Sequence, residues 1–308
     1  MKRSVDLIFA VTFIVMSAVV LTGGECVPRP PLDVKALFCD GGAGGRETAS
    51  DCEALVFESG GSEIFGQILL PERSFGGAVP CVLIFHGFAG FGRFDDIGQA
   101  LCRAGCVVLI PHHRGAWGSR GKYTVSHCVE DAVNLVRYVR SPAFRKKYRI
   151  DPEAVFLIGH SMGGNTVLNA AAEVPGVRGI VMLAPCDIGT MFRKMPKEEM
   201  KKFMIDNGLA VLRTDGFEAV YDDLARHAAD HAFPKAAARL KDVDLLLVTG
   251  EWDTCVPGGP VKDFYAAACA AGKNRIRTFK SYRARHGLMG VRTRITRDIA
   301  DFILESLK

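Results

Sequence analysis

Short apolar runs alternate with longer segments of helical periodicity over most of this chain. The runs lie at Ala54–Glu58, Ile64–Leu70, Cys81–Phe85, Cys106–Ile110, Val155–Ile158, Ile180–Leu183, Leu245–Val248 and Ile276–Phe279. Continuous runs of Val, Ile and Leu are typical of strands that are buried on both faces. Their alternation with helices favours parallel pairing, so we predict an α/β fold with a mostly parallel sheet.

The segments between these runs have a helical pattern. We expect helices around Phe94–Arg103, over roughly Val125–Lys147, over Asn165–Glu173 and over Ile295–Leu307. The first two apolar runs are separated only by Ser59-Gly60-Gly61, which favours a hairpin.

The first 24 residues differ from the rest of the chain. Lys2 and Arg3 precede an apolar run from Leu7 to Leu21, which small residues follow. This order is typical of a secretory signal peptide, so we expect an exported protein, either periplasmic or secreted. Two alternatives stay open, an uncleaved membrane anchor and lipid attachment at Cys26, although Glu25 disfavours lipid attachment.

Residues 25–50 are rich in proline and glycine, and we predict an irregular linker or arm there. Cys39 and Cys52 flank its glycine-rich part, so an oxidising compartment allows a disulfide between them. Cys81 and Cys106 lie inside apolar runs and are expected to be buried thiols. No two of the ten cysteines have the Cys-x-x-Cys spacing of a zinc or redox site.

The alternation of strands and helices lapses between Leu183 and Lys241. Residues 187–240 are charged, rich in methionine and helical in pattern, and they contain no strand candidate. An insertion there would lie over the carboxyl edge of a parallel sheet, where such sheets bind ligands. We therefore predict a small helical cap over the site. The alternative is a surface excursion that does not contact substrate.

The net charge of +5 comes from 39 basic and 34 acidic residues, and neighbouring charges are mixed in sign. Lys197, Lys201 and Lys202, for example, lie beside Glu198 and Glu199, as on the solvated face of a helix. The sequence has no basic patch interleaved with aromatic residues, which argues against nucleic-acid binding.

Gly159-His160-Ser161-Met162-Gly163 has the form Gly-x-Ser-x-Gly and directly follows an apolar run. A helical segment begins just after it, so the motif lies in the strand–turn–helix setting of a nucleophile elbow. The sharp turn forces an unfavourable backbone on the serine, and glycine neighbours avoid collisions there. The amino terminus of the helix also favours negative charge beside the serine. We therefore predict that Ser161 is a nucleophile.

A serine hydroxyl needs a base to take its proton, and the base needs an acid to orient it. His286 follows the last predicted strand and Asp253 follows the strand before it, so both belong to loops at the carboxyl edge. We predict a triad of Ser161, Asp253 and His286, whose order along the chain fits a nucleophile elbow. Glu251 and Asp187 remain as alternative acids.

A tetrahedral intermediate needs hydrogen-bond donors that are preset for its oxyanion. The loop His86–Gly90 follows a predicted strand and is expected to flank the serine. We assign the backbone N–H groups of Phe88 and Met162 to this oxyanion hole. His86 is expected to shape the loop by a hydrogen bond, and His160 is expected to point away from the serine turn.

Two adjacent histidines, His112 and His113, follow the run Cys106–Ile110. No carboxylate or cysteine lies nearby at ligand spacing, so we expect no metal there. Asp131, on the following helix, is expected to anchor this loop by a salt bridge or a helix cap.

These motifs resemble those of bacterial α/β hydrolases of the prolyl-oligopeptidase-like and dienelactone-hydrolase-like group, and feruloyl-type esterases share much of the pattern. The similarity spans about residues 54–307 and is carried by His86–Gly90, Arg114–Gly121, Glu130-Asp131, Gly159–Gly164 and Gly250–Pro257. It implies an α/β-hydrolase fold with an eight-stranded sheet in a catalytic domain over residues 51–308, and it implies no cofactor.

Departures from the family pattern bear on the reaction. No β-propeller precedes the catalytic domain, Ser161 stands where dienelactone hydrolases usually have cysteine, and Arg285 replaces an acidic residue that often precedes the histidine. These points favour a carboxylesterase acting on small acyl or aryl esters through an acyl-enzyme. An exopeptidase or amidase is the first alternative, and a binding protein without activity is the second. The expected partner is a small-molecule ester or amide.

Overall fold

The computed structural model describes residues 32–39, 50–72, 77–237, 239–240, 242–256, 258–272 and 275–308. The predicted signal peptide and most of the predicted linker lie outside these ranges. The chain divides into two units, Met1–Pro30 and Pro31–Lys308, and every described residue belongs to the second, which is compact. Among the described residues, no helix is long and apolar enough to cross a membrane.

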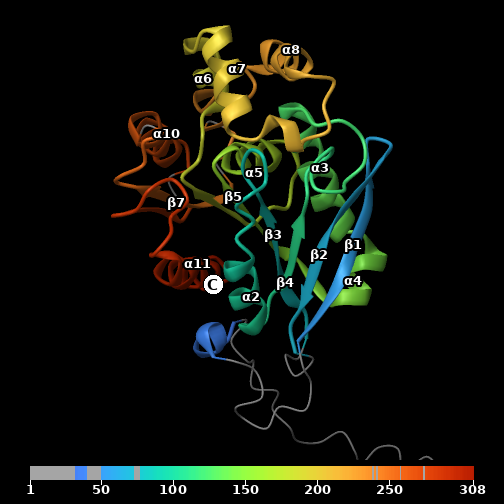
Figure 1. Cartoon of the computed structure of the whole chain (residues 1–308). Coiled ribbons are helices and arrows are strands. Elements are labelled where there is room, and N and C mark those ends of the chain that lie inside the picture. Colours follow the sequence, from blue (N-terminus) through green and yellow to red (C-terminus); the bar gives the residue numbers. More distant parts are fainter. Residues whose placement is uncertain are drawn as a thin grey trace, which may run out of the picture. The chain divides into compact units, whose positions relative to one another are not determined.

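One eight-stranded sheet forms the centre of the second unit (Figure 1). Its strand order is β1-β2-β4-β3-β5-β6-β7-β8, in which β1, β2 and β4 pair antiparallel and all other neighbours pair parallel. The strands are β1 Asp51–Ser59, β2 Ser62–Leu70, β3 Val79–Phe85, β4 Val107–Pro111, β5 Ile150–His160, β6 Gly179–Leu183, β7 Asp244–Gly250 and β8 Arg277–Tyr282. The predicted mostly parallel, eight-stranded sheet is confirmed.

The sheet separates two hydrophobic cores because successive side chains of a strand point to opposite faces. In β3, for example, Leu83 and Phe85 belong to one core, and Val82 and Ile84 belong to the other. Helices α3, α4, α5 and α10 line the first core, and η1, α2 and α11 line the second. Their bounds are η1 Val34–Phe38, α2 Asp95–Arg103, α3 Val125–Val139, α4 Pro142–Tyr148, α5 Met162–Glu173, α10 Gly258–Ala271 and α11 Arg292–Ser306.

The helix predicted over Val125–Lys147 is two helices, α3 and α4, so that prediction was wrong in its continuity. Ser141 begins α4 by accepting a hydrogen bond from the Phe144 N–H, and Pro142 occupies the first turn. Proline has no N–H, so it suits a first turn and interrupts the hydrogen bonds of a longer helix.

Part of the predicted linker is folded onto the second core. Leu32 and Leu37 are buried there among residues of α2 and α11. The Asp33 N–H donates to the Ala104 carbonyl at 2.8 Å, and the Arg103 guanidinium donates to the Leu37 carbonyl at 2.7 Å. Burial of two leucines stabilises this segment by about 3–6 kcal/mol before entropy is counted. Residues 32–39 therefore differ from the expected free arm.

Residues 187–240 form the predicted helical insertion. In Figure 1, α6, α7 and α8 gather at one end of the sheet, above the start of α5. The helices of the insertion are α6 Ile188–Lys194, α7 Lys197–Asp206, η2 Leu209–Val211, α8 Phe217–His227 and α9 Phe233–Ala237. Because the insertion follows β6 and precedes β7, it lies at the carboxyl edge of the sheet.

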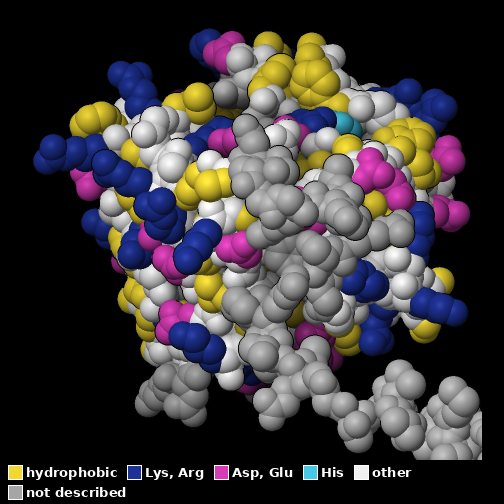
Figure 2. Space-filling view, turned by 90° about the horizontal axis from the view of Figure 1, so that it is seen from below, with side chains coloured by type: hydrophobic (Ala, Val, Ile, Leu, Met, Phe, Trp, Pro, Cys, Tyr) yellow, Lys and Arg dark blue, Asp and Glu magenta, His cyan; other side chains and the backbone are white. Residues whose placement is uncertain are grey.

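The surface charges of the described residues are mixed in sign, as the sequence predicts, and the cysteines of these residues are unpaired. On the face that Figure 2 shows, Lys and Arg side chains lie among Asp and Glu side chains rather than in one basic field. The nine described cysteines are free thiols. The disulfide that the sequence allows between Cys39 and Cys52 is therefore not formed in this structure.

Candidate active site

Ser161 lies at the turn between β5 and α5, with backbone angles φ 56° and ψ −119°. A non-glycine residue in such a conformation costs on the order of 1–3 kcal/mol, which its surroundings must offset. Its N–H donates to the Leu183 carbonyl at 2.9 Å. A Cβ on Gly163 would lie 2.3 Å from the Phe85 carbonyl oxygen, so only glycine fits there. The elbow is therefore held by β6 on one side and by the end of β3 on the other.

The loop after β3 lies directly against this serine. A Cβ on Gly87 would lie 3.0 Å from the Ser161 Cβ. Met162 is the first residue of α5, where a backbone N–H has no acceptor within the helix. The N–H groups of Phe88 and Met162 thus belong to two segments that meet beside Ser161, as an oxyanion hole requires.

Tyr123 connects the two segments of this predicted oxyanion hole. Its hydroxyl donates to the Met162 Sδ at 2.7 Å, and its ring meets the Phe88 ring edge to face at 5.9 Å. Tyr123 is buried, just before α3. Sequence reasoning missed it because no local motif marks a lone tyrosine in a polar segment.

His286 and Asp253 meet at the same edge of the sheet. The His286 Nδ1 lies 2.8 Å from the Asp253 Oδ2, and Asp253 is nearly buried while 24% of the His286 side chain is exposed. The other oxygen of Asp253 accepts from the N–H groups of Cys255 and Val256, at 2.9 and 3.0 Å. A carboxylate only accepts, so Nδ1 carries a proton and leaves Nε2 of a neutral imidazole as the acceptor.

Burial tends to raise the pKa of Asp253, but hydrogen bonds from His286 and Val256 outweigh burial and hold the pKa below its ordinary value. Asp253 is therefore a carboxylate at neutral pH. A charged acid beside Nδ1 fixes the tautomer and stabilises an imidazolium when one forms.

His160 fastens the His286 loop to the nucleophile elbow. Its Nε2 lies 2.9 Å from the His286 carbonyl oxygen, and the two rings lie 4.8 Å apart. Burial, with the nearby His286, lowers the pKa of His160 to about 3, so this histidine is neutral and donates from Nε2. Its ring packs on Phe94 at 4.7 Å. His160 is therefore a positioning residue.

The alternative acids have other partners. The Asp187 Oδ1 accepts from the N–H of Thr190 at 3.0 Å and from the N–H of Phe233 at 3.3 Å, so this carboxylate caps α6. Glu251 is exposed and lies 3.9 Å from the Arg283 guanidinium. Of the three candidate acids, only Asp253 is hydrogen-bonded to a histidine.

The histidines at 86, 112 and 113 pack beneath the loop after β3. The Nδ1 of His86 lies 2.8 Å from the Gly87 carbonyl oxygen, and its Nε2 accepts from the His113 N–H at 3.3 Å. Burial lowers the pKa of all three, that of His112 to about 4, so they are neutral. In the described part of the chain, no cluster of His, Cys, Asp and Glu has the arrangement of a metal site.

Asp131 anchors the loop after β4, as the sequence suggests. Arg114 donates its backbone N–H to one oxygen of Asp131 at 2.9 Å and its guanidinium to the other at 2.6 Å. Ser59, from the β1–β2 hairpin, donates to the same carboxylate at 2.6 Å. This buried network fixes the loop that carries His112 and His113.

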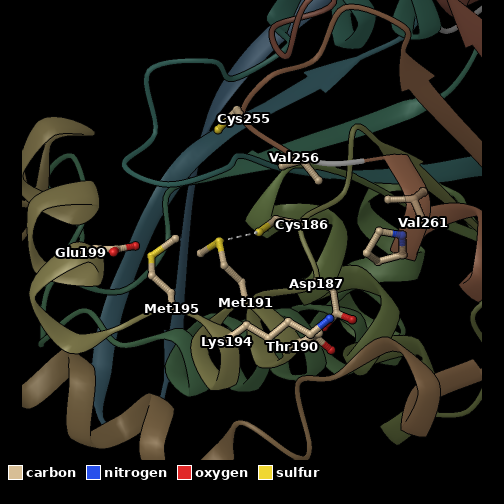
Figure 3. Close-up of a pocket in the computed structure, with 11 residues that line it drawn as sticks. Cys186, Asp187, Thr190, Met191, Lys194, Met195, Glu199, Cys255, Val256 and Val261 are labelled. Atoms are coloured by element: carbon tan, nitrogen blue, oxygen red, sulfur yellow. Dashed lines mark hydrogen bonds between the residues drawn. The ribbon is translucent and has the colours of Figure 1, made fainter.

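A cavity of about 400 Å³ opens between the loop after β6, α6, the acid loop and the start of α10, and neither Ser161 nor His286 is among its lining residues (Figure 3). Met191 and Met195 lie side by side along one part of its wall, and Cys186, from the loop after β6, points toward Met191. The Cys186 N–H donates to the Ser161 carbonyl at 3.0 Å, so the cavity begins next to the nucleophile. Cys255 lines the other side, two residues after Asp253. The cavity thus lies beside the proposed reacting groups and beneath the insertion.

Comparisons with known proteins agree with this geometry. A family model described as serine aminopeptidase S33 matches residues 78–206, which include Ser161 but neither Asp253 nor His286. A monoglyceride lipase of Rattus norvegicus is 36% identical over 111 residues, which are 34% of this chain and 35% of that protein. The gibberellin receptor GID1C of Arabidopsis thaliana is 28% identical over 141 residues, 42% of this chain and 40% of the receptor. The match thus spans about a third of the length of the lipase.

Solved structures resemble the chain over a larger part. Est1E from Butyrivibrio proteoclasticus, with ferulic acid bound, is 18% identical and has a TM-score of 0.63, covering 82% of this chain and 99% of that one. The Pyrococcus furiosus esterase Pf2001 is 17% identical with a TM-score of 0.57, covering 83% and 93%. The sheet order, the serine elbow and these likenesses agree, and they show that the chain has the α/β-hydrolase fold.

Proposed function

We propose that this protein cleaves small carboxylic esters through a triad of Ser161, His286 and Asp253. The observation that carries the proposal is the 2.8 Å contact between His286 Nδ1 and Asp253 Oδ2. The His286 loop is also hydrogen-bonded to His160, the residue before Ser161. An imidazole oriented by a carboxylate, on a loop that is bonded to a strained serine elbow, is the arrangement that can activate a hydroxyl for attack.

The reaction follows from these positions. His286 takes the hydroxyl proton at Nε2 while the Ser161 oxygen attacks the ester carbonyl carbon. The resulting oxyanion accepts hydrogen bonds from the N–H groups of Phe88 and Met162. The intermediate then expels the alcohol, which receives the proton from His286, and leaves an acyl-enzyme. Water, deprotonated by His286, attacks the acyl carbonyl in the same way and releases the carboxylic acid.

The cavity beneath the insertion would hold the acyl or aryl group of the ester, and its lining favours a small apolar group. Its walls include Met191, Met195 and Val256, and methionine adapts its shape to apolar groups. Est1E, with a similar fold, has ferulic acid bound.

An aminopeptidase is the second candidate because the matching family model carries that description. A substrate amine requires an unpaired carboxylate near the serine. Two carboxylates line the cavity, Asp187, whose Oδ1 caps α6, and Glu199, an exposed residue of α7 that a substrate amine would have to use. The methionine-rich wall favours the ester proposal, and the kinetics below decide between the two.

Kinetics on two substrate classes distinguish the candidates. We expect turnover of p-nitrophenyl acetate and butyrate, little turnover of aminoacyl p-nitroanilides, and a loss of at least about 1,000-fold in kcat for His286→Gln. More efficient hydrolysis of the anilides would replace the esterase with a peptidase. Folded protein without turnover of either class would favour a binding protein, the role that the name of the gibberellin receptor suggests for that relative.

We also propose that residues 1–24 direct export and are removed, on the strength of Lys2, Arg3 and the apolar run Leu7–Leu21. Amino-terminal sequencing of protein recovered from the exported fraction tests this. A new terminus near residue 25 is expected. An intact terminus in a membrane fraction would support an anchor instead, and a lipid on Cys26 would support the lipoprotein alternative.

A further inference from the structure

A second cavity, of about 390 Å³, lies between α3, the end of α5, and the segment from α8 to Arg239. It contains neither Ser161 nor any residue of the first cavity. Glu173, which lines it, is the last residue of α5, whereas Ser161 caps the first turn of that helix. Twelve residues of helix separate the two ends by roughly 17 Å, so this groove is distinct from the proposed active site.

His231 is the buried polar side chain of this groove. It is 4% exposed, and neither of its ring nitrogens has a hydrogen-bond partner among the described residues. Its backbone is fixed, since the Asn165 side chain donates to the His231 carbonyl at 2.6 Å. Leaving a buried donor and acceptor unpaired costs about 1–3 kcal/mol, which a bound group would relieve. His227 lies one helical turn away with its ring 6.2 Å from that of His231.

The groove is lined by charged groups of both signs, and two of its basic groups lack an ion pair among the described residues. Its lining includes the acids Glu130, Glu173 and Asp230 and the bases Arg137 and Arg239. Glu130 already pairs with Arg114 at 2.9 Å, and Asp230 already pairs with Lys235.

Glu130 shares Arg114 with Asp131, and Glu173 has no ion pair among the described residues. Arg137 and Arg239 are the two lining guanidinium groups whose donors remain available to a ligand. Arg137 donates to the Asn134 side chain at 3.2 Å, and Arg239 donates to the Ala172 carbonyl at 2.9 Å. Neither arginine has an ion pair in the part of the chain that the structure describes. Each retains several N–H donors, because a guanidinium has five.

We propose that this groove binds a small oxyanion, a carboxylate or a phosphate group, between Arg137, Arg239 and His231. A guanidinium presents its N–H donors in a fork that matches both kinds of oxyanion. A neutral imidazole adds one ring N–H as a third donor. The same contact gives the buried His231 ring a partner, which it lacks within the described part of the chain.

Histidine NMR of the full-length protein tests the proposal. The protein, labelled with 15N-histidine, is titrated with succinate in one arm and inorganic phosphate in the other, with sodium chloride at matched ionic strength as the reference. We expect the His231 signal, identified by its loss in His231→Phe, to shift saturably below about 50 mM of at least one anion. If only succinate saturates the shift, the site is specific for a carboxylate. If only phosphate does, the site is specific for a phosphate group, and if both do, the site accepts either oxyanion.

Surface variants separate the site from general charge effects. Arg137→Gln and Arg239→Gln are expected to weaken binding at least tenfold and to leave the fold intact, because each exposed guanidinium makes one hydrogen bond, to the Asn134 side chain or to the Ala172 carbonyl, and no ion pair in the described part of the chain. Arg226→Gln is the matched control, since Arg226 is an exposed arginine of α8 that does not line the groove. A shift that does not saturate, or equal weakening in all three variants, would overturn the proposal.

Discussion

At the scale of single residues, the site depends on groups that hold other groups in place. Ser161 keeps an unfavourable backbone because Gly159 lets the start of α5 fold back against β5 and Gly163 lets the end of β3 approach the elbow. His286 has its tautomer set by Asp253 and its loop held by His160. The chemistry that we propose therefore needs three side chains, but their geometry needs several more.

Asp253→Asn tests which acid orients His286. An amide oxygen still accepts from the Cys255 and Val256 N–H groups, so the fold is expected to survive. The amide NH₂ cannot accept the Nδ1 proton, so the imidazole takes the wrong tautomer and kcat is expected to fall by about 10,000-fold. Asp187→Asn and Glu251→Gln are the controls, each within a few-fold of wild type. A near-normal rate for Asp253→Asn together with a large loss in one of the controls would assign the acid role to the residue changed in that control.

Gly163→Ala tests the packing of the elbow. The new Cβ would lie 2.3 Å from the Phe85 carbonyl oxygen, so β3 or the start of α5 must shift. We expect the free energy of unfolding to fall by about 1–3 kcal/mol, the usual cost of overpacking. Gly258→Ala is the matched control because a Cβ there has no neighbour within 4 Å. Urea unfolding measures both, and equal stabilities would contradict the packing account.

At the scale of elements, the sequence predicts strands better than it predicts where segments dock. The strands β3 to β7 were found from continuous apolar runs, because burial on both faces leaves that pattern. The strands β1, β2 and β8 were found as well, although the structure leaves them only partly buried. Ser161, Asp253 and His286 could be placed at one edge because each follows a strand. The break at Ser141-Pro142 was missed because amphipathic spacing continues across it. The docking of residues 32–39 was missed because it depends on only two leucines, Leu32 and Leu37, which form no periodic pattern. The contact between Cys186 and Ser161 was missed because it exists only when β6 lies beside β5.

The insertion is expected to set the size of the acyl group. Met195, just before α7, lines the first cavity, so Met195→Trp should fill part of its space. We expect kcat/KM for p-nitrophenyl octanoate to fall at least tenfold, about 1.4 kcal/mol, while that for acetate changes little. Ile205→Trp, at an exposed position of α7 that does not line the cavity, is the control. An equal loss on both esters would mean that the insertion does not discriminate acyl length.

At the scale of the whole molecule, buried histidines couple folding to pH. Burial lowers the pKa of His86, His112, His113, His160 and His231. Unfolding frees these groups to bind protons near the ordinary pKa of 6.5, whereas the folded protein binds them only at lower pH. Their contribution to stability is therefore complete above pH 6.5 and is lost as pH falls toward the folded pKa values.

Urea unfolding between pH 7 and pH 5 measures this effect. Each histidine contributes at most about 1.4 kcal/mol per pH unit, so the free energy of unfolding is expected to fall by several kcal/mol over this range. The pKa of Asp253 is also lowered, but its contribution is lost only below its unfolded pKa, near pH 4. Constant stability from pH 7 to pH 5 would show that these histidines are not held neutral by the fold.

Labelling of Ser161 by a fluorophosphonate probe tests the central claim most directly. Wild-type protein and Ser161→Ala are treated with the probe in parallel, and the labelled peptide is identified by mass spectrometry. We predict rapid labelling at Ser161, no labelling of the folded variant, and labelling slowed by orders of magnitude in His286→Gln. Folded wild-type protein that takes no label at Ser161, or a variant that is labelled and active, would contradict the account of this site as that of a serine hydrolase.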